Sequence, residues 1–128
     1  GYNYSNDSWG KELRSEIGSI DLVIDSGGGD GMNSVLDTLK NGGRYVFFGA
    51  TQGNPSRGLN MAKLFFKQIR IQGTTMGRLE EFQGMIDFVS SNKLEPIIEQ
   101  IFEFADAIAA HERMLNSEQM GKIVLRFG

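Results

Sequence analysis

The chain has 128 residues with 40% hydrophobic residues and a formal net charge of −3, which suffices for one globular domain and excludes intrinsic disorder. It contains no Cys and one His, which excludes disulfides, thiolate chemistry and zinc clusters of His and Cys. The acidic balance argues against nucleic acid as a partner, and the apolar runs are too short to cross a membrane, so we expect a cytoplasmic protein with neither of these partners.

The first elements are predicted from the spacing of apolar residues. Trp9, Leu13 and Ile17 recur at four-residue steps, which predicts an amphipathic helix that ends at Gly18. The short apolar run 21–25 follows. Short apolar runs bounded by turn residues are typical of strands buried on both faces, as in parallel sheets.

The middle of the chain continues this alternation. Apolar residues at helical spacing predict a helix over 32–39, closed by Asn41-Gly42-Gly43, and a strand follows over 44–49. A helix over 59–67 precedes a strand over 69–75, whose alternating pattern leaves one face half exposed.

The C-terminal part begins with the longest helical stripe, over 79–92. A strand over 97–104, a helix over 105–116 and a last strand over 122–127 complete the chain. The regular order of strands and helices predicts an α/β fold with a parallel sheet.

Glycine is unusually frequent, and it recurs where predicted strands end, in 25–29, 48–51 and 72–77. Ligands of open parallel sheets bind beyond the carboxyl ends of the strands, and glycine lets phosphates and riboses approach the backbone. Each of these segments alone is an ordinary turn, but together they favour a nucleotide site. No GxGxxG or GxxxxGK[ST] motif occurs, so the usual pyrophosphate cradle is missing from this sequence.

Four segments, 20–28, 39–51, 66–77 and 121–125, resemble in order and spacing the C-terminal part of the medium-chain dehydrogenase/reductase superfamily, which comprises zinc-type alcohol dehydrogenases and zinc-free NADPH:quinone reductases. The resemblance implies a partial Rossmann-like, doubly wound parallel sheet with helices on both faces that lacks the first strand-helix-strand. It also implies that 1–92 is the C-terminal part of a nucleotide-binding domain. Residues 93–128 then return to the catalytic domain of the parent enzyme.

The resemblance implies an NAD(P)-dependent parent oxidoreductase. It would transfer a hydride between NADP or NAD and a small-molecule quinone, enone, aldehyde or alcohol. The phosphate loop, the residue that selects NAD or NADP, the zinc ligands and the proton relay of the family match nothing in this sequence, so no catalytic residue and no metal ligand is carried over. We expect the chain alone to lack hydride transfer and to bind cofactor weakly.

Ten residues match cofactor-contacting positions of the family. Ser26 and Gly27 match the loop beside the adenosine ribose, and Lys122 matches a basic position near the pyrophosphate. The residues that match segments beside the nicotinamide ring and its carboxamide are Phe48, Gly49, Ala50, Thr51, Thr74, Thr75 and Met76. Structural explanations also exist, since Thr favours strands, Met fills gaps and Lys is usually solvated.

Other features favour roles without chemistry. Asp25 ends a strand and is expected to bond the local backbone, and His111 is expected to be a packed or surface imidazole. The chain could instead be a non-catalytic dimerisation or nucleotide-binding module. The strand over 69–75 is expected at the sheet edge, where it would form a homodimer, with 97–104 and 122–127 disordered or exchanged between chains.

Overall fold

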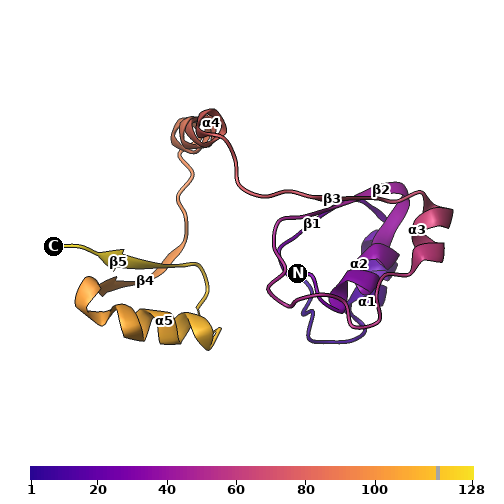
Figure 1. Cartoon of the computed structure of the whole chain (residues 1–128), viewed down its shortest axis with the longest axis horizontal. Helices are drawn as coiled ribbons and strands as arrows, with labels where there is room; N and C mark the ends of the chain where they lie inside the picture. The colour runs from indigo at the N-terminus through magenta and orange to yellow at the C-terminus, as the bar shows by residue number, and fades with distance from the viewer. Residues whose placement is uncertain (118) are drawn as a thin grey trace. The chain divides into compact units, whose positions relative to one another are not determined.

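The computed structural model describes residues 1–117 and 119–128. The chain divides into two compact units, residues 1–76 and residues 77–128 (Figure 1). The first unit contains α1 (Trp9–Ile17), β1 (Ile20–Asp25), α2 (Gly31–Thr38), β2 (Leu39–Phe47), α3 (Met61–Lys67) and β3 (Arg70–Gly73). The second contains α4 (Leu79–Ser91), β4 (Ile98–Glu103), the 3-10 turn η1 (Phe104–Asp106), α5 (Ala107–Leu115) and β5 (Lys122–Arg126).

A three-stranded parallel sheet in the order β1-β2-β3 forms the centre of the first unit. Val23, Tyr45 and Ile71 are direct neighbours across the three strands, and all belong to one hydrophobic core. Leu36 of α2 and Leu39 at the start of β2 are fully buried in that core. The sheet and its helices confirm the predicted α/β fold with parallel strands.

The opposite face of β1 is more exposed. Leu22 and Ile24 alternate with the core residues along the strand, and their exposed fractions are 46% and 67%. Side chains of successive strand residues point to opposite faces of a sheet. Only one face of β1 therefore packs into the core of the first unit, whereas the sequence predicts burial on both faces.

The boundary between α2 and β2 differs from the prediction. The helix ends at Thr38 and the strand begins at Leu39, five residues earlier than predicted. Ile20 pairs with Leu39 and Leu22 with Arg44, so residues 40–43 bulge out of the ladder. Gly42, with φ of 75°, provides the left-handed backbone that this bulge requires.

Basic side chains from α1 and α3 form hydrogen bonds with backbone carbonyl oxygens at the C-terminal end of α2. The Lys67 ammonium donates to the carbonyl oxygens of Asp37 and Leu39, at 3.0 and 2.6 Å, and Arg14 donates to that of Asp37 at 3.2 Å. Lys63 forms an ion pair with the Asp37 side chain. Cations stabilise a helix at this end because its last carbonyls lack helical partners. The contacts attach α1 and α3 to α2.

The second unit contains a parallel pair of strands, β4 and β5. Arg113 of α5 forms an ion pair with Glu99 of β4, and the rings of Phe104 and Phe127 lie 4.6 Å apart. The two segments pair with each other as ordered strands, so the expectation that they are disordered is wrong, whereas exchange between chains stays a prediction. None of the helices in the described ranges has the length and apolar character needed to span a bilayer.

Candidate functional site

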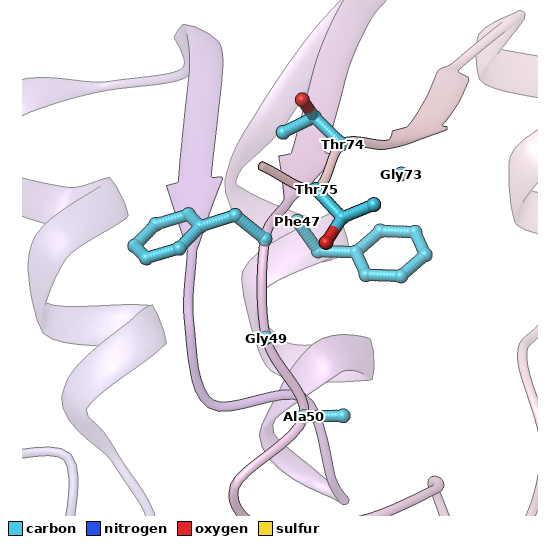
Figure 2. A pocket seen from close by; sticks show the side chains of 7 residues that line it. Phe47, Gly49, Ala50, Gly73, Thr74 and Thr75 are labelled. Carbon is cyan, nitrogen blue, oxygen red and sulfur yellow. The ribbon is translucent and has the colours of Figure 1, made fainter. Parts of the chain in front are cut away.

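A cavity of about 430 Å³ lies where β2 and β3 end (Figure 2). It is lined by Phe47, Phe48, Gly49, Ala50, Gly73, Thr74 and Thr75. The amide of Thr74 donates to the carbonyl of Phe47 at 2.9 Å, which extends the ladder one residue beyond β3. The two chain segments therefore leave the sheet side by side and enclose this first cavity between them.

Two glycines line this cavity, and a side chain is disfavoured at each of them for a different structural reason. A Cβ at Gly73 would lie 3.2 Å from the ring of Phe47, so the missing side chain leaves room beside that ring. A Cβ at Gly49 would lie 2.8 Å from the carbonyl oxygen of Ser26. Gly49 is therefore needed for the close approach of the segments that follow β1 and β2, with or without a ligand.

A second cavity of about 500 Å³ lies beyond the ends of β1 and β2. Its described lining residues are Tyr4, Asp7, Trp9, Asp25, Ser26, Gly27, Gly28, Asp30, Gly31, Ser34, Val35, Thr51 and Gln52. Three of them are carboxylates, and none of those described is Lys or Arg. This cavity is polar and acidic, whereas the first is lined mainly by carbon.

The Asp25 carboxylate organises the edge of the second cavity. It accepts hydrogen bonds from the amides of Gly27 and Gly28, at 2.8 and 3.1 Å, and from the hydroxyl of Tyr45. Partial burial by itself would raise the pKa of Asp25, but these hydrogen bonds outweigh it and hold the pKa below the usual aspartate value. The expected backbone role of Asp25 is confirmed.

Tyr45 is fully buried at the centre of the sheet, next to this carboxylate. Burial, the hydrogen bond to Asp25 and the negative charge of Asp25 all raise the pKa of the Tyr45 hydroxyl. The phenol is therefore a hydrogen-bond donor over the whole physiological pH range, and it holds the end of β1 against β2.

The loops after β1 and β2 are bonded to each other. The amide of Gln52 donates to the carbonyl of Gly27 at 2.9 Å, and the amide of Gly29 donates to that of Gly53 at 2.8 Å. Further along, the carboxylate of Asp30 accepts bonds from the amide and the hydroxyl of Ser56. The two loops therefore form one ordered structure that borders both cavities.

Eight of the ten residues predicted to contact cofactor line these cavities. The first cavity is lined by Phe48, Gly49, Ala50, Thr74 and Thr75, and the second by Ser26, Gly27 and Thr51. Thr51 matches the segment beside the nicotinamide, but the structure places it in the second cavity. Met76 lines neither cavity; it is 95% exposed at the end of the first unit. Lys122 begins β5 in the second unit, and its assignment to the pyrophosphate stays a prediction.

Sequence reasoning missed several lining residues. Phe47 could have been found, because it is the last residue of β2 and directly precedes the predicted segment that begins at Phe48. Tyr4, Trp9 and Gln52 carry no such local signal. Tyr4 precedes α1, Trp9 is the first residue of α1 and Gln52 lies in the loop after β2, and only the fold brings these segments together.

The described residues do not fit a zinc site. No three His, Asp or Glu side chains converge within the part of the chain that the structure describes, and the sequence has no Cys. His111 lies exposed on α5 and lines neither cavity. We therefore assign no step to a metal ion held by these residues.

Comparisons with known proteins agree with this arrangement. The profile of a family described as zinc-binding dehydrogenase matches residues 2–125. The chain is 33% identical, over 132 residues, to the zinc-type alcohol dehydrogenase-like protein YogA of Leptosphaeria maculans, an alignment that covers 97% of this chain and 36% of that protein. It is 31% identical to a probable quinone oxidoreductase of Schizosaccharomyces pombe, over 83% of this chain and 34% of that protein.

Among solved structures, an NAD-dependent alcohol dehydrogenase matches with a TM-score of 0.88 at 29% identity, over 99% of this chain and 37% of that chain. The chain spans about a third of the length of the curated relatives it matches.

Proposed function

The chain belongs to the zinc-binding dehydrogenase family of the medium-chain dehydrogenase/reductase superfamily, and we propose that it provides cofactor-binding loops of an NAD(P)-dependent oxidoreductase. The parent reaction would transfer a hydride between the nicotinamide and a small-molecule quinone, enone, aldehyde or alcohol. The observation that carries this proposal is the pair of cavities at the carboxyl edge of the parallel sheet, lined by eight of the ten residues that match cofactor-contacting positions of the family. That edge is where open α/β sheets bind nucleotides.

The first cavity suits the nicotinamide ring. Phe47 and Phe48 offer apolar surface, and Gly73 leaves space beside the ring of Phe47. The amide of Thr74 is used by the carbonyl of Phe47, whereas the amide of Thr75 has no backbone partner within the described residues. Thr75 is therefore the donor of this turn that we assign to the carboxamide oxygen.

The role of these residues is to bind and orient the ring, because the nicotinamide itself supplies the hydride chemistry. Hydride transfer needs the reacting atoms in a narrow range of positions, and a displacement of about 1 Å can cost roughly a hundredfold in rate. The ladder bond between Thr74 and Phe47 gives the cavity two fixed walls, one from each strand end.

The second cavity suits the adenosine ribose. Ser26 and Gly27, which match the ribose loop of the family, border it together with Thr51, and Asp7, Asp25 and Asp30 add carboxylates that can accept bonds from ribose hydroxyls. The described lining residues include no Lys or Arg to neutralise an added phosphate. We therefore propose that this cavity accepts a ribose with free hydroxyls more readily than a phosphorylated one.

The test is a titration of the chain with NADH, followed by the backbone amide resonances. We expect saturable shifts at residues 26–28, 48–52 and 74–75, and a dissociation constant far weaker than the value of about 1 μM that corresponds to −8 kcal/mol. The amides of α5 in the second unit serve as the internal control. Absence of shifts at about 10 mM NADH, which corresponds to a binding free energy of about −3 kcal/mol, would contradict the proposed cofactor site.

A second candidate role is pairing with another copy of the chain through β3. Within the described residues β3 has one strand neighbour, β2, so its other edge is open. Because the amide of Thr74 faces β2, the amides of Ile71 and Gly73 face the open edge. Sedimentation velocity should show a dimer, and the Ile71 amide should exchange more slowly as concentration rises. A monomer at about 100 μM, far above the Kd of a specific protein complex, would rule this pairing out.

A further inference from the structure

A hydrogen-bonded pair links the edge strand β1 to the central strand β2. Tyr45 is fully buried, and its hydroxyl donates to the Asp25 carboxylate, 20 residues away in the sequence. The same carboxylate binds the amides of Gly27 and Gly28. One side chain of β2 thus fixes the group that shapes the loop after β1.

The effect of this pair reaches the loop after β2. Gly27 accepts the amide of Gln52, and Gly29 donates to Gly53 across the same gap. The two loops are closely packed here, because a Cβ at Gly29 would lie 2.7 Å from the Cβ of Gln52. A shift of the loop after β1 must therefore move the loop after β2, which lines both cavities.

We propose that Asp25 and Tyr45 act as a positioning pair that holds these two loops, and through them both cavities, in the geometry that receives the cofactor. The inference rests on the proposed function for the identity of the ligand, but its structural content concerns the loops alone. Neither side chain is assigned contact with the reacting atoms.

The pair is suited to this task because the Tyr45 side chain is fully buried. A buried phenol without an acceptor leaves a polar group unsatisfied, and a hydrogen bond to a charged acceptor is stronger than a neutral one. The carboxylate in turn has three donors on three different residues. Loss of one donor leaves the others to bind a carboxylate whose direction is no longer fixed.

Other charged groups near this carboxylate are identifiable. Asp7 and Asp30 line the same cavity, and Asp30 is bonded to Ser56 and close to the charge of Arg57. Variants Asp7→Asn and Asp30→Asn therefore serve as controls, since each removes one of the other two carboxylates of this cavity. The described residues that line this cavity include no further acidic or basic side chain.

The test compares Tyr45→Phe with the wild-type chain by amide resonances, using Tyr2→Phe as the matched control, since Tyr2 bonds Glu16 instead. In the wild type, the chemical shifts of the Gly27 and Gly28 amides should report the titration of Asp25, with a midpoint below the ordinary aspartate value of about 3.9. In Tyr45→Phe the midpoint should rise by about one pH unit, and hydrogen exchange at Gln52 and Gly29 should accelerate at least about tenfold. Exchange in the core helix α2 should change less, and Tyr2→Phe should change none of these values.

Two results would overturn the proposal. One is an unchanged midpoint with unchanged exchange at Gln52 and Gly29; the other is equal acceleration of all amides, which indicates global destabilisation only. If Tyr45→Phe does not fold, Asp25→Asn is compared with Asp21→Asn on the same strand, and only Asp25→Asn should free the two loops. An NADH titration of the same samples decides the proposed function separately, because the loop measurements need no ligand.

Discussion

The two ends of the sheet edge in the first unit are built differently. The loops after β1 and β2 are joined by the Asp25 carboxylate and by backbone bonds between Gly27 and Gln52 and between Gly29 and Gly53. The turn after β3 has one backbone bond to its neighbour, from Thr74 to Phe47, and then leads to the fully exposed Met76. One end is a closed hydrogen-bond network, whereas at the other the amide of Thr75 has no backbone partner within the described residues.

The sequence difference behind this contrast is small. β1 ends with an aspartate followed by Ser26-Gly27-Gly28, so a carboxylate meets amides that small residues leave accessible. β3 ends at Gly73 and is followed by two threonines, without an acid at the strand end. The carboxylate that ends β1 therefore bonds the amides of its own loop, whereas β3 has no acid in the corresponding position.

The largest difference in unfolding free energy between the two ends is expected when side chains are added at Gly49 and Gly73. Gly49→Val should destabilise the chain by about 2 to 3 kcal/mol, because its Cβ meets the backbone oxygen of Ser26. Gly73→Val should cost about 1 kcal/mol, since it meets the side chain of Phe47, which can rotate. Urea denaturation of both variants measures the difference. Equal losses would mean that the two ends are equally rigid.

The next effect is the pH dependence of stability. The lowered pKa of Asp25 means that its ionised form stabilises the folded chain above the unfolded value of about 3.9, and that this contribution is lost as pH falls through the lower folded value. The raised pKa of Tyr45 has the opposite sense, so its contribution is present below about 10 and is lost as pH rises further.

Stability attributable to the pair should therefore be constant between about pH 4 and 10. The difference in unfolding free energy between wild type and Tyr45→Phe, about 1 to 2 kcal/mol in that range, should shrink on both sides of it. Denaturation at several pH values measures this difference. The test values are about pH 7, in the middle of the range, and about pH 3 and pH 11, roughly one unit outside its limits. An equal difference in unfolding free energy at all three would show that the hydroxyl does not interact with the carboxylate.

A third prediction concerns the acidic cavity of the closed end. NADH should bind about tenfold more tightly than NADPH, because the lining carboxylates repel an added phosphate. Parallel titrations at low salt measure the ratio, and Asp7→Asn should reduce it. Tighter binding of NADPH would place the phosphate away from this cavity.

The smallest expected effect belongs to the open end. Thr75→Pro removes the backbone donor assigned to the carboxamide and should weaken NADH binding about threefold to fivefold, with a change in unfolding free energy of less than about 0.5 kcal/mol. Thr75→Ser keeps the amide and is the matched control. Unchanged affinity in Thr75→Pro would remove this amide from the site.

Most helices and strands, and the points where the loops leave the sheet, could be predicted from local sequence patterns. Helical spacing located α1, α4 and α5 to within a few residues, because amphipathic periodicity is a local property. Gly18 was recognisable as the end of α1, and it has the left-handed φ of 81° that only glycine adopts easily. The local role of Asp25 was also predictable, since its amide partners lie two and three residues away.

The contacts between these elements could not be predicted in the same way, because they depend on the fold. The bulge that lets β2 begin at Leu39 follows from its register with β1, which no local pattern encodes. The bond from Tyr45 to Asp25, and the meeting of Tyr4, Trp9 and Gln52 around one cavity, join residues far apart in the chain. Such contacts depend on strand order and register, so the sequence could indicate a ligand-binding edge but not the hydrogen-bond network that shapes it.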